Sequence, residues 1–122
     1  MSKVLITTIP FAVKNRLPLD LLEKRGIEYL INPFNKKITE NELIEVVADF
    51  DVIIAGTELI TKKVMDAATN LKMISRVGIG LDSVDLLEAE KREIVVSYTP
   101  DAPAPAVAEL TIGLMLSLLR SV

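Results

Sequence analysis

The sequence predicts a doubly wound α/β fold, in which helices cover both faces of a parallel sheet. Short apolar runs without polar alternation recur along the 122 residues, and segments with helix-capping residues separate them. Strands that are buried on both faces have this composition, and alternating strands and helices give a parallel sheet. Half of the residues are hydrophobic, which is enough for one domain with a core.

Five apolar runs are the predicted strands. They lie at residues 3–8, 27–31, 51–55, 71–77 and 94–98. Five strands joined by right-handed crossovers favour the flavodoxin-like strand order 2-1-3-4-5. The carboxyl ends of such strands meet at one edge of the sheet, where ligands bind. The loops expected there are 8–16, 56–58, 76–80 and 98–103.

Each helix between these strands has a start or stop signal. Pro18 suits the first turn of the first helix, and Gly26 suits its end. Thr39 and Glu42 have the spacing of a capping box that opens the second. Thr61 can cap the third, and either Ser83 or Asp85 the fourth. The residues expected to face the core are Leu19, Leu22, Leu43, Ile44, Val46, Val47, Val64, Met65 and Ala68.

The last helix, predicted over residues 105–119, is apolar on every side. It has nine apolar residues from Val107 onward, whereas a surface helix shows a single apolar stripe. It therefore needs contacts on more than one side. Two arrangements remain open: a dimer formed through this helix, or a helix folded back on its own sheet. Glu109 is either a first-turn residue that the helix dipole stabilises or a polar contact to a missing partner. The dimer interface would be centred on Leu110, Leu114, Met115 and Leu118.

Composition excludes several classes of function. The net charge of −3 argues against a nucleic-acid surface. With no histidine and no cysteine, the chain has no Ser/His/Asp triad and no thiolate, and it lacks the commonest metal ligand, so no metal site is predicted. No apolar run is long enough for a membrane span, and a cytoplasmic location is expected.

The turn Gly78-Ile79-Gly80 ends the fourth strand, and two interpretations of it stay open. It is either a tight βα connection or a cradle of backbone N–H groups for a carboxylate. It is not the dinucleotide fingerprint, because Ser83 stands where a third glycine is needed. Asp82 and Asp85 would also repel a multiply charged phosphate.

The stretch NLKMISRVGIGLDSVDLLEAEKREIVVSYTP, followed by PAVAELTIGLML, closely resembles the N-terminal lobe of the D-isomer-specific 2-hydroxyacid dehydrogenases. Their phosphoglycerate dehydrogenase-like branch is nearest. Gly56 and Thr57, with the following ITKKVMDAA, match the third βα connection of that family. The resemblance covers residues 3–122.

This resemblance implies a substrate-binding lobe over residues 1–103 and a linking helix over 104–122 that leads to a Rossmann NAD domain absent from the chain. It places a 2-hydroxy or 2-oxo acid such as 3-phosphoglycerate in the lobe and NAD beside it. The chain departs from the family at Tyr98 and Pro103, where many members have asparagine. The implied substrate-binding residues are Val77, Gly78, Ile79, Gly80, Gly56 and Thr57, and the implied cofactor contacts are Ile79, Tyr98 and Val107.

The family's catalytic arginine, glutamate and histidine lie beyond residue 122, so no catalytic residue is assigned to this chain. We expect a fragment of an NAD-dependent oxidoreductase that is inactive alone and dimerises through residues 105–120. The alternative is a stand-alone, non-catalytic flavodoxin-like binding or interaction module.

Overall fold

The computed structural model describes residues 2–78, 80–99 and 104–119, with only the backbone described at 104–107. Its centre is a parallel sheet in the order β2-β1-β3-β4-β5, which confirms the predicted α/β fold and strand order. The strands are β1 (Lys3–Ile6), β2 (Glu28–Ile31), β3 (Val52–Ala55), β4 (Met73–Arg76) and β5 (Val95–Ser97). All five are shorter than predicted: β1 gives up its last two residues to the loop at the carboxyl edge, whereas β2 and β3 each begin one residue later than predicted.

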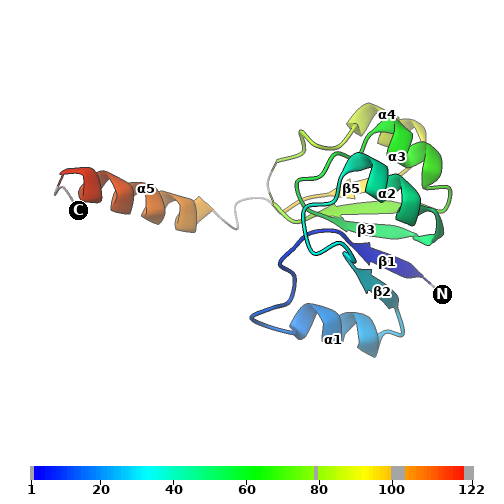
Figure 1. Ribbon diagram of the computed structural model, residues 1–122, viewed down its shortest axis with the longest axis horizontal. Coiled ribbons are helices and arrows are strands. Elements are labelled where there is room, and N and C mark those ends of the chain that lie inside the picture. Colours follow the sequence, from blue (N-terminus) through cyan, green and yellow to red (C-terminus); the bar gives the residue numbers. More distant parts are fainter. Residues whose placement is uncertain (1, 79, 100–103, 120–122) are drawn as a thin grey trace.

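Helices pack on both faces of this sheet (Figure 1). One face carries α1 (Leu17–Lys24). The other carries α2 (Glu40–Val46), the 3-10 turn η1 (Val47–Asp49), α3 (Lys62–Ala67) and α4 (Leu86–Lys91). The last helix, α5 (Ala104–Leu119), lies apart from this α/β body.

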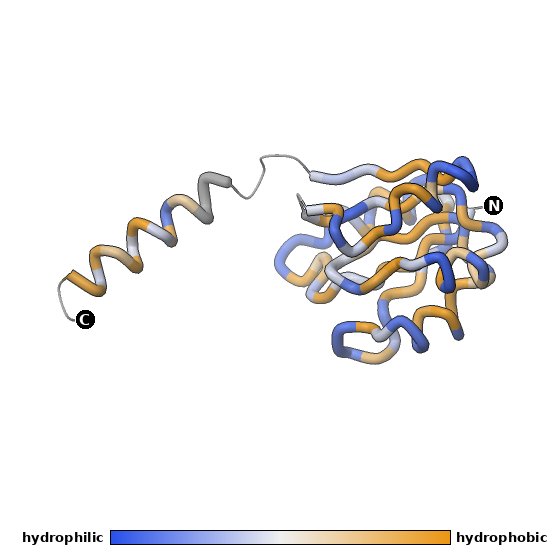
Figure 2. The backbone as a smooth tube through the Cα atoms, turned by 90° about the horizontal axis from the view of Figure 1, so that it is seen from above, coloured by the Kyte–Doolittle hydropathy of each residue, from blue (hydrophilic) through white to orange (hydrophobic). Residues whose placement is uncertain are grey.

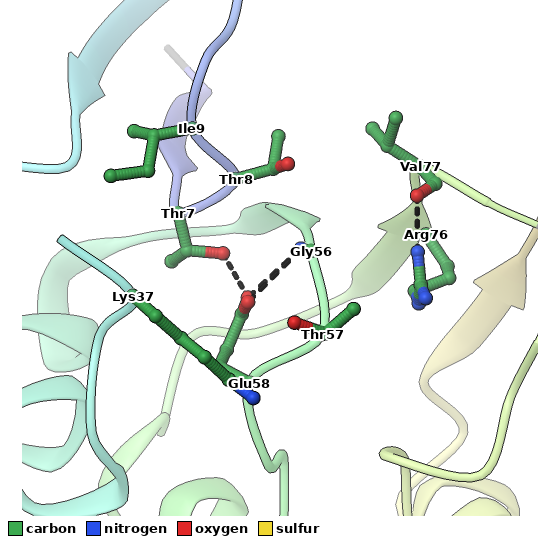
Figure 3. A pocket seen from close by; sticks show the side chains of 9 residues that line it. All are labelled: Thr7, Thr8, Ile9, Lys37, Gly56, Thr57, Glu58, Arg76 and Val77. Atoms are coloured by element: carbon green, nitrogen blue, oxygen red, sulfur yellow. Dashed lines mark hydrogen bonds between the residues drawn. The ribbon is translucent and has the colours of Figure 1, made fainter. Parts of the chain in front are cut away.

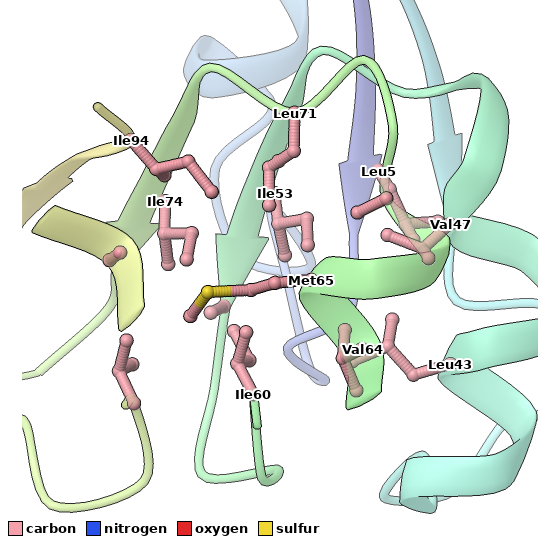
Figure 4. Packing of buried hydrophobic residues seen from close by; sticks show 14 of the residues in the cluster. Leu5, Leu43, Val47, Ile53, Ile60, Val64, Met65, Leu71, Ile74 and Ile94 are labelled. Atoms are coloured by element: carbon pink, nitrogen blue, oxygen red, sulfur yellow. The ribbon is translucent and has the colours of Figure 1, made fainter. Parts of the chain in front are cut away.

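The main core lies between the sheet and the layer of α2, α3 and α4 (Figure 4). Alternate strand residues point to it, so Leu5, Ile53 and Ile74 are fully buried there. Leu43 and Val64 face them from α2 and α3. Of the residues expected to face inward, Leu19, Leu43, Val47, Val64, Met65 and Ala68 are buried, and Leu22, Ile44 and Val46 are half-buried.

The face on the α1 side is covered over only part of its width. Val4, Val52, Met73 and Val95 form one row across the sheet through their pairing. The row begins at Val4, which is 4% exposed beside α1, and ends at Val95, which is 60% exposed. No described helix covers the β4–β5 half of this face.

The predicted caps are confirmed. The Thr39 hydroxyl accepts from the Glu42 amide, and the Glu42 carboxylate accepts in return from the Thr39 amide. Thr61 and Asp85 cap α3 and α4. The Asp85 cap is one-sided, because the Glu88 carboxylate pairs with Arg92 at 2.8 Å instead.

The backbone of the apolar helix α5 lies away from the sheet (Figures 1 and 2). Its described large apolar side chains are exposed. Leu118 and Leu119 are 82% and 80% exposed. The helix therefore does not fold back on the sheet, and dimerisation stays a prediction. Glu109 is exposed as well. None of the described helices has the length and apolar character needed to cross a membrane.

Candidate functional site

A pocket of about 260 Å³ opens at the carboxyl edge of the sheet, over the ends of β1, β3 and β4 (Figure 3). Three of the four predicted loops contribute to it. The fourth loop, which follows β5, contacts the glycine turn beside the pocket: the Thr99 amide donates to the Gly78 carbonyl at 2.8 Å. The residues that line the pocket are Thr7, Thr8, Ile9, Lys37, Gly56, Thr57, Glu58, Arg76 and Val77.

Strand register explains why these residues meet. Ile6 pairs with both Ile31 and Ile54, so Thr7 leaves β1 between the ends of β2 and β3. Ala55 pairs with Arg76, so the loops after β3 and β4 begin at the same level. The polar residues that follow the strands therefore gather at one edge of the sheet.

The two glycines of the turn differ in the space around them. Gly78 has φ +142°, where any other residue would be strained, and a Cβ there would overlap the Arg76 guanidinium. At Gly80 a Cβ would meet open space. Ile79, predicted to bind both substrate and cofactor, lies outside the described residues.

The predicted carboxylate cradle is smaller than expected. The Val77 amide donates to the Ala55 carbonyl at 2.8 Å as part of the sheet, so it is not available to a ligand. This corrects the prediction of Val77 as an amide donor, although its side chain still lines the pocket. No described residue accepts a hydrogen bond from the amide of Gly78 or of Gly80.

Glu58 is a site residue that sequence reasoning missed. It is 2% exposed, the only acidic side chain that is buried in the described part of the chain. Its carboxylate accepts a hydrogen bond from the Thr7 hydroxyl and contacts from the Gly56 amide at 3.1 Å to both oxygens (Figure 3). In the sequence, an acid after a glycine-ended strand is a weak signal, because such positions are usually exposed.

Gly56 and Thr57 lie where predicted, beside this carboxylate. A Cβ at Gly56 would lie 3.1 Å from Glu58 and from Thr8, so a larger residue would crowd the loop. Thr57 is exposed, and it also borders a second hollow, of about 240 Å³, beside Gly80.

Of the two remaining predicted cofactor contacts, only Tyr98 has a described side chain. Tyr98 is half-exposed after β5 and does not line the pocket. The side chain of Val107 lies outside the described residues, as does Pro103.

Two cations line the pocket without acidic partners. Lys37, which sequence reasoning also missed, forms no ion pair with any described residue. The Arg76 guanidinium donates to the Val77 carbonyl, and its Nε is buried with no hydrogen-bond partner among the described residues. With the hydroxyls of Thr8 and Thr57, these groups can hold a small anion. Among the described residues, no group of acidic side chains could hold a metal ion.

Comparison with known proteins gives a consistent family. Residues 4–113 match the family model described as D-isomer specific 2-hydroxyacid dehydrogenase, catalytic domain. A hydroxypyruvate reductase of Thermotoga maritima is 37% identical over 109 residues, covering 84% of this chain and 36% of that protein. A D-3-phosphoglycerate dehydrogenase of Methanocaldococcus jannaschii is 41% identical over 87 residues, covering 70% of this chain and 16% of that protein.

Solved structures agree with this result. The NAD⁺-bound 3-phosphoglycerate dehydrogenase of Entamoeba histolytica superposes with a TM-score of 0.83 at 30% identity, covering 95% of this chain and 38% of that one. The chain thus spans about a third of the length of that enzyme and of the reductase.

Proposed function

The chain belongs to the D-isomer specific 2-hydroxyacid dehydrogenase family, and on that premise we propose that it is the substrate-binding lobe of an NAD-dependent enzyme. In the whole enzyme, a hydride would pass between C2 of a 2-hydroxy acid and the nicotinamide. The observation that carries the proposal is the pair of amides at Gly78 and Gly80, which donate to no described residue and lie beside a small polar pocket.

In this proposal the lobe positions the substrate. The substrate carboxylate accepts hydrogen bonds from the amides of Gly78, Gly80 and Ile79, and the rest of the acid extends toward Thr57 and Thr8. Fixed amide dipoles and proximity favour the reaction without a proton-transferring group in the lobe. A volume of about 260 Å³ lies below the range of about 300–1,000 Å³ that drug-sized ligands occupy, so a short acid is expected.

The described residues do not fit a whole dinucleotide. The glycine turn lacks the third glycine of the fingerprint, and the pocket is too small. We therefore assign NAD chiefly to a domain outside these 122 residues, with Ile79, Tyr98 and Val107 at most bordering it. Residues 1–103 would be the lobe, and 104–122 the helix toward that domain. A homodimer through residues 105–120 belongs to the same proposal.

An NMR titration of this chain with oxalate tests the proposal. We expect shifts at the amides of residues 78–80, with millimolar or weaker affinity, because an exposed anion contact of this kind is worth only about 0.3–1 kcal/mol. Calorimetric titration with NADH should show no micromolar binding. Shifts confined to other loops, or tight NADH binding, would contradict the assignment.

A pair of matched variants controls for strain. Gly78→Ala and Gly26→Ala both replace a glycine of positive φ, at +142° and +68°. Gly26 follows α1, away from the pocket, and a Cβ there meets no atom within 4 Å. Oxalate shifts should disappear in Gly78→Ala and persist in Gly26→Ala.

A further inference from the structure

Three buried polar side chains lie at or beside the pocket: Thr7 and Glu58 line it, and Asn32 bonds to Thr7. Thr7, Asn32 and Glu58 are 1%, 3% and 2% exposed, and they are the only polar or charged residues that are buried in the described part of the chain. Each follows a different strand: β1, β2 and β3. Burial of polar groups is costly unless they are bonded, so such a cluster needs an explanation.

The three residues form one continuous network, in which Thr7 takes part through both its backbone carbonyl and its hydroxyl. The Asn32 amide group donates to the Thr7 carbonyl at 3.1 Å and to the Lys36 carbonyl at 2.8 Å, while its oxygen accepts from the Phe34 amide at 2.9 Å. Asn32 thus fixes the turn that precedes Lys37. The Thr7 hydroxyl continues the network to the Glu58 carboxylate.

At its other end the network holds the loop after β3. The Glu58 side chain folds back on its own loop and accepts from the Gly56 amide. The absence of a side chain at Gly56 permits this contact, since a Cβ would lie 3.1 Å from Glu58 Oε2. Thr57, between the two, is held at the pocket rim.

We propose that Thr7, Asn32 and Glu58 are positioning residues that preorganise the pocket, by fixing together the three loops that bear Thr8, Lys37 and Thr57. This inference rests on the proposed function of the pocket. Thr7 and Glu58 form part of the pocket wall, and every loop that the network joins also contributes a more exposed lining group. Glu58 acts through its hydrogen bonds, and its charge has no part in the role.

If hydrogen bonds and not charge explain the role of Glu58, Glu58→Gln and Thr7→Val should differ in their effects. In Glu58→Gln, the new amide can donate to Thr7 Oγ1, the Thr7 hydroxyl can turn to the Ile54 carbonyl at 3.2 Å, and the Gln oxygen can accept from Gly56. The Thr7 hydroxyl and the Gly56 amide both keep a partner, and only the second N–H of the new side-chain amide gains none from this network. In Thr7→Val, the shape is kept but the carboxylate loses its hydroxyl donor.

The experiment compares these variants in the 122-residue chain by NMR. Without ligand, Thr7→Val should shift the amides of residues 56–58 and 36–37, and Glu58→Gln should leave residues 36–37 in place. With oxalate as the probe, Thr7→Val should weaken binding at least fivefold, and Glu58→Gln less than twofold. Thr7→Ser, which restores the hydroxyl, should rescue both readouts, and Thr69→Val at an exposed threonine should change neither.

Two outcomes would overturn the inference. In one, Thr7→Val stays folded with residues 36–37 and 56–58 unmoved. In the other, Glu58→Gln loses oxalate as severely as Thr7→Val, which would make the charge itself the functional group. If Thr7→Val does not fold, Glu58→Gln and Thr7→Ser decide the same question. Failure of the unmodified chain to bind oxalate would count against the proposed function, whereas the ligand-free shifts still test the network.

Discussion

Helices α3 and α5 are both rich in apolar residues, yet their surroundings are opposite. In α3, a helix of six residues, Val64 and Met65 are buried at 0% and 1% exposure. In α5, with sixteen residues, the described leucines are 57% to 82% exposed. Apolar composition therefore does not decide burial. The α3 helix has a cap and a sheet face to cover, whereas α5 has neither among the described residues.

This difference indicates that the surface which α5 needs lies outside the described α/β body. Most of the stability of a helix in a protein comes from tertiary packing, which the described side chains of the sixteen-residue α5 do not have within this body. Exposed apolar surface of this extent marks an interaction site. The predictions that follow test whether the body is complete and α5 incomplete.

The largest expected effect comes from truncating matched leucines in the two regions. Leu43 is fully buried in α2, and Leu119 is 80% exposed in α5. Leu43→Ala should lower the free energy of unfolding by about 2–5 kcal/mol, because it leaves a cavity in the core. Leu119→Ala should change it by about 0.5 kcal/mol or less. Urea unfolding followed by circular dichroism measures both. Equal losses would show that α5 is packed in the folded chain.

The next effect concerns self-association through α5. Burying a leucine contributes at most about 1.5–3 kcal/mol, so Leu114→Glu with Leu118→Glu should raise the dimer dissociation constant by about 100-fold or more. Sedimentation at tens of micromolar should show a dimer for the unmodified chain and a monomer for this variant. Ile112→Glu with Leu116→Glu adds the same charge to the opposite side of the helix, and it should leave the dimer in place. A monomeric unmodified chain would refute the prediction.

The sequence was sufficient to predict the strands and helices of the α/β body. In that region, the apolar runs and capping residues indicate the same elements that are buried in the structure. Runs such as the third strand, DVIIA, and caps such as Thr39 act within a few residues. The bare β4–β5 half of the α1-side face was not predicted, since it depends on where a distant helix lies. Val95 reads as a buried strand residue but is 60% exposed.

The candidate site could be predicted only where the backbone decides it. Glycines show in the sequence, so the turn at residues 78–80 was found. The buried state of Glu58 and the approach of Lys37 depend on contacts between loops that are 21 residues or more apart, which no local pattern records. Whether the Val77 amide is free depends on strand register, which the sequence leaves open.

The smallest effect concerns helix capping, which stabilises α2 and is not described for α5. Helix α2 is only seven residues long, and its capping box closes the first turn. Replacing Thr39 by alanine should lower the free energy of unfolding by about 0.5–2 kcal/mol.

The capping box also predicts that the stability of the fold depends on pH. The Thr39 backbone N–H donates to the Glu42 carboxylate at 2.9 Å and, with Lys36, holds the pKa of that carboxyl below its ordinary value.

Because the pKa of Glu42 is lower in the folded state than the unfolded value of about 4.3, the carboxylate stabilises the fold above that value. This contribution is lost as the pH falls through the folded pKa. The difference in unfolding free energy between the unmodified chain and Glu42→Gln should therefore shrink between pH 6 and pH 3. Glu45→Gln removes the same charge from an exposed position of α2 that has no described partner, and it serves as the control. If both variants followed the same pH profile, net charge would explain the effect, and α2 would owe its stability to packing alone.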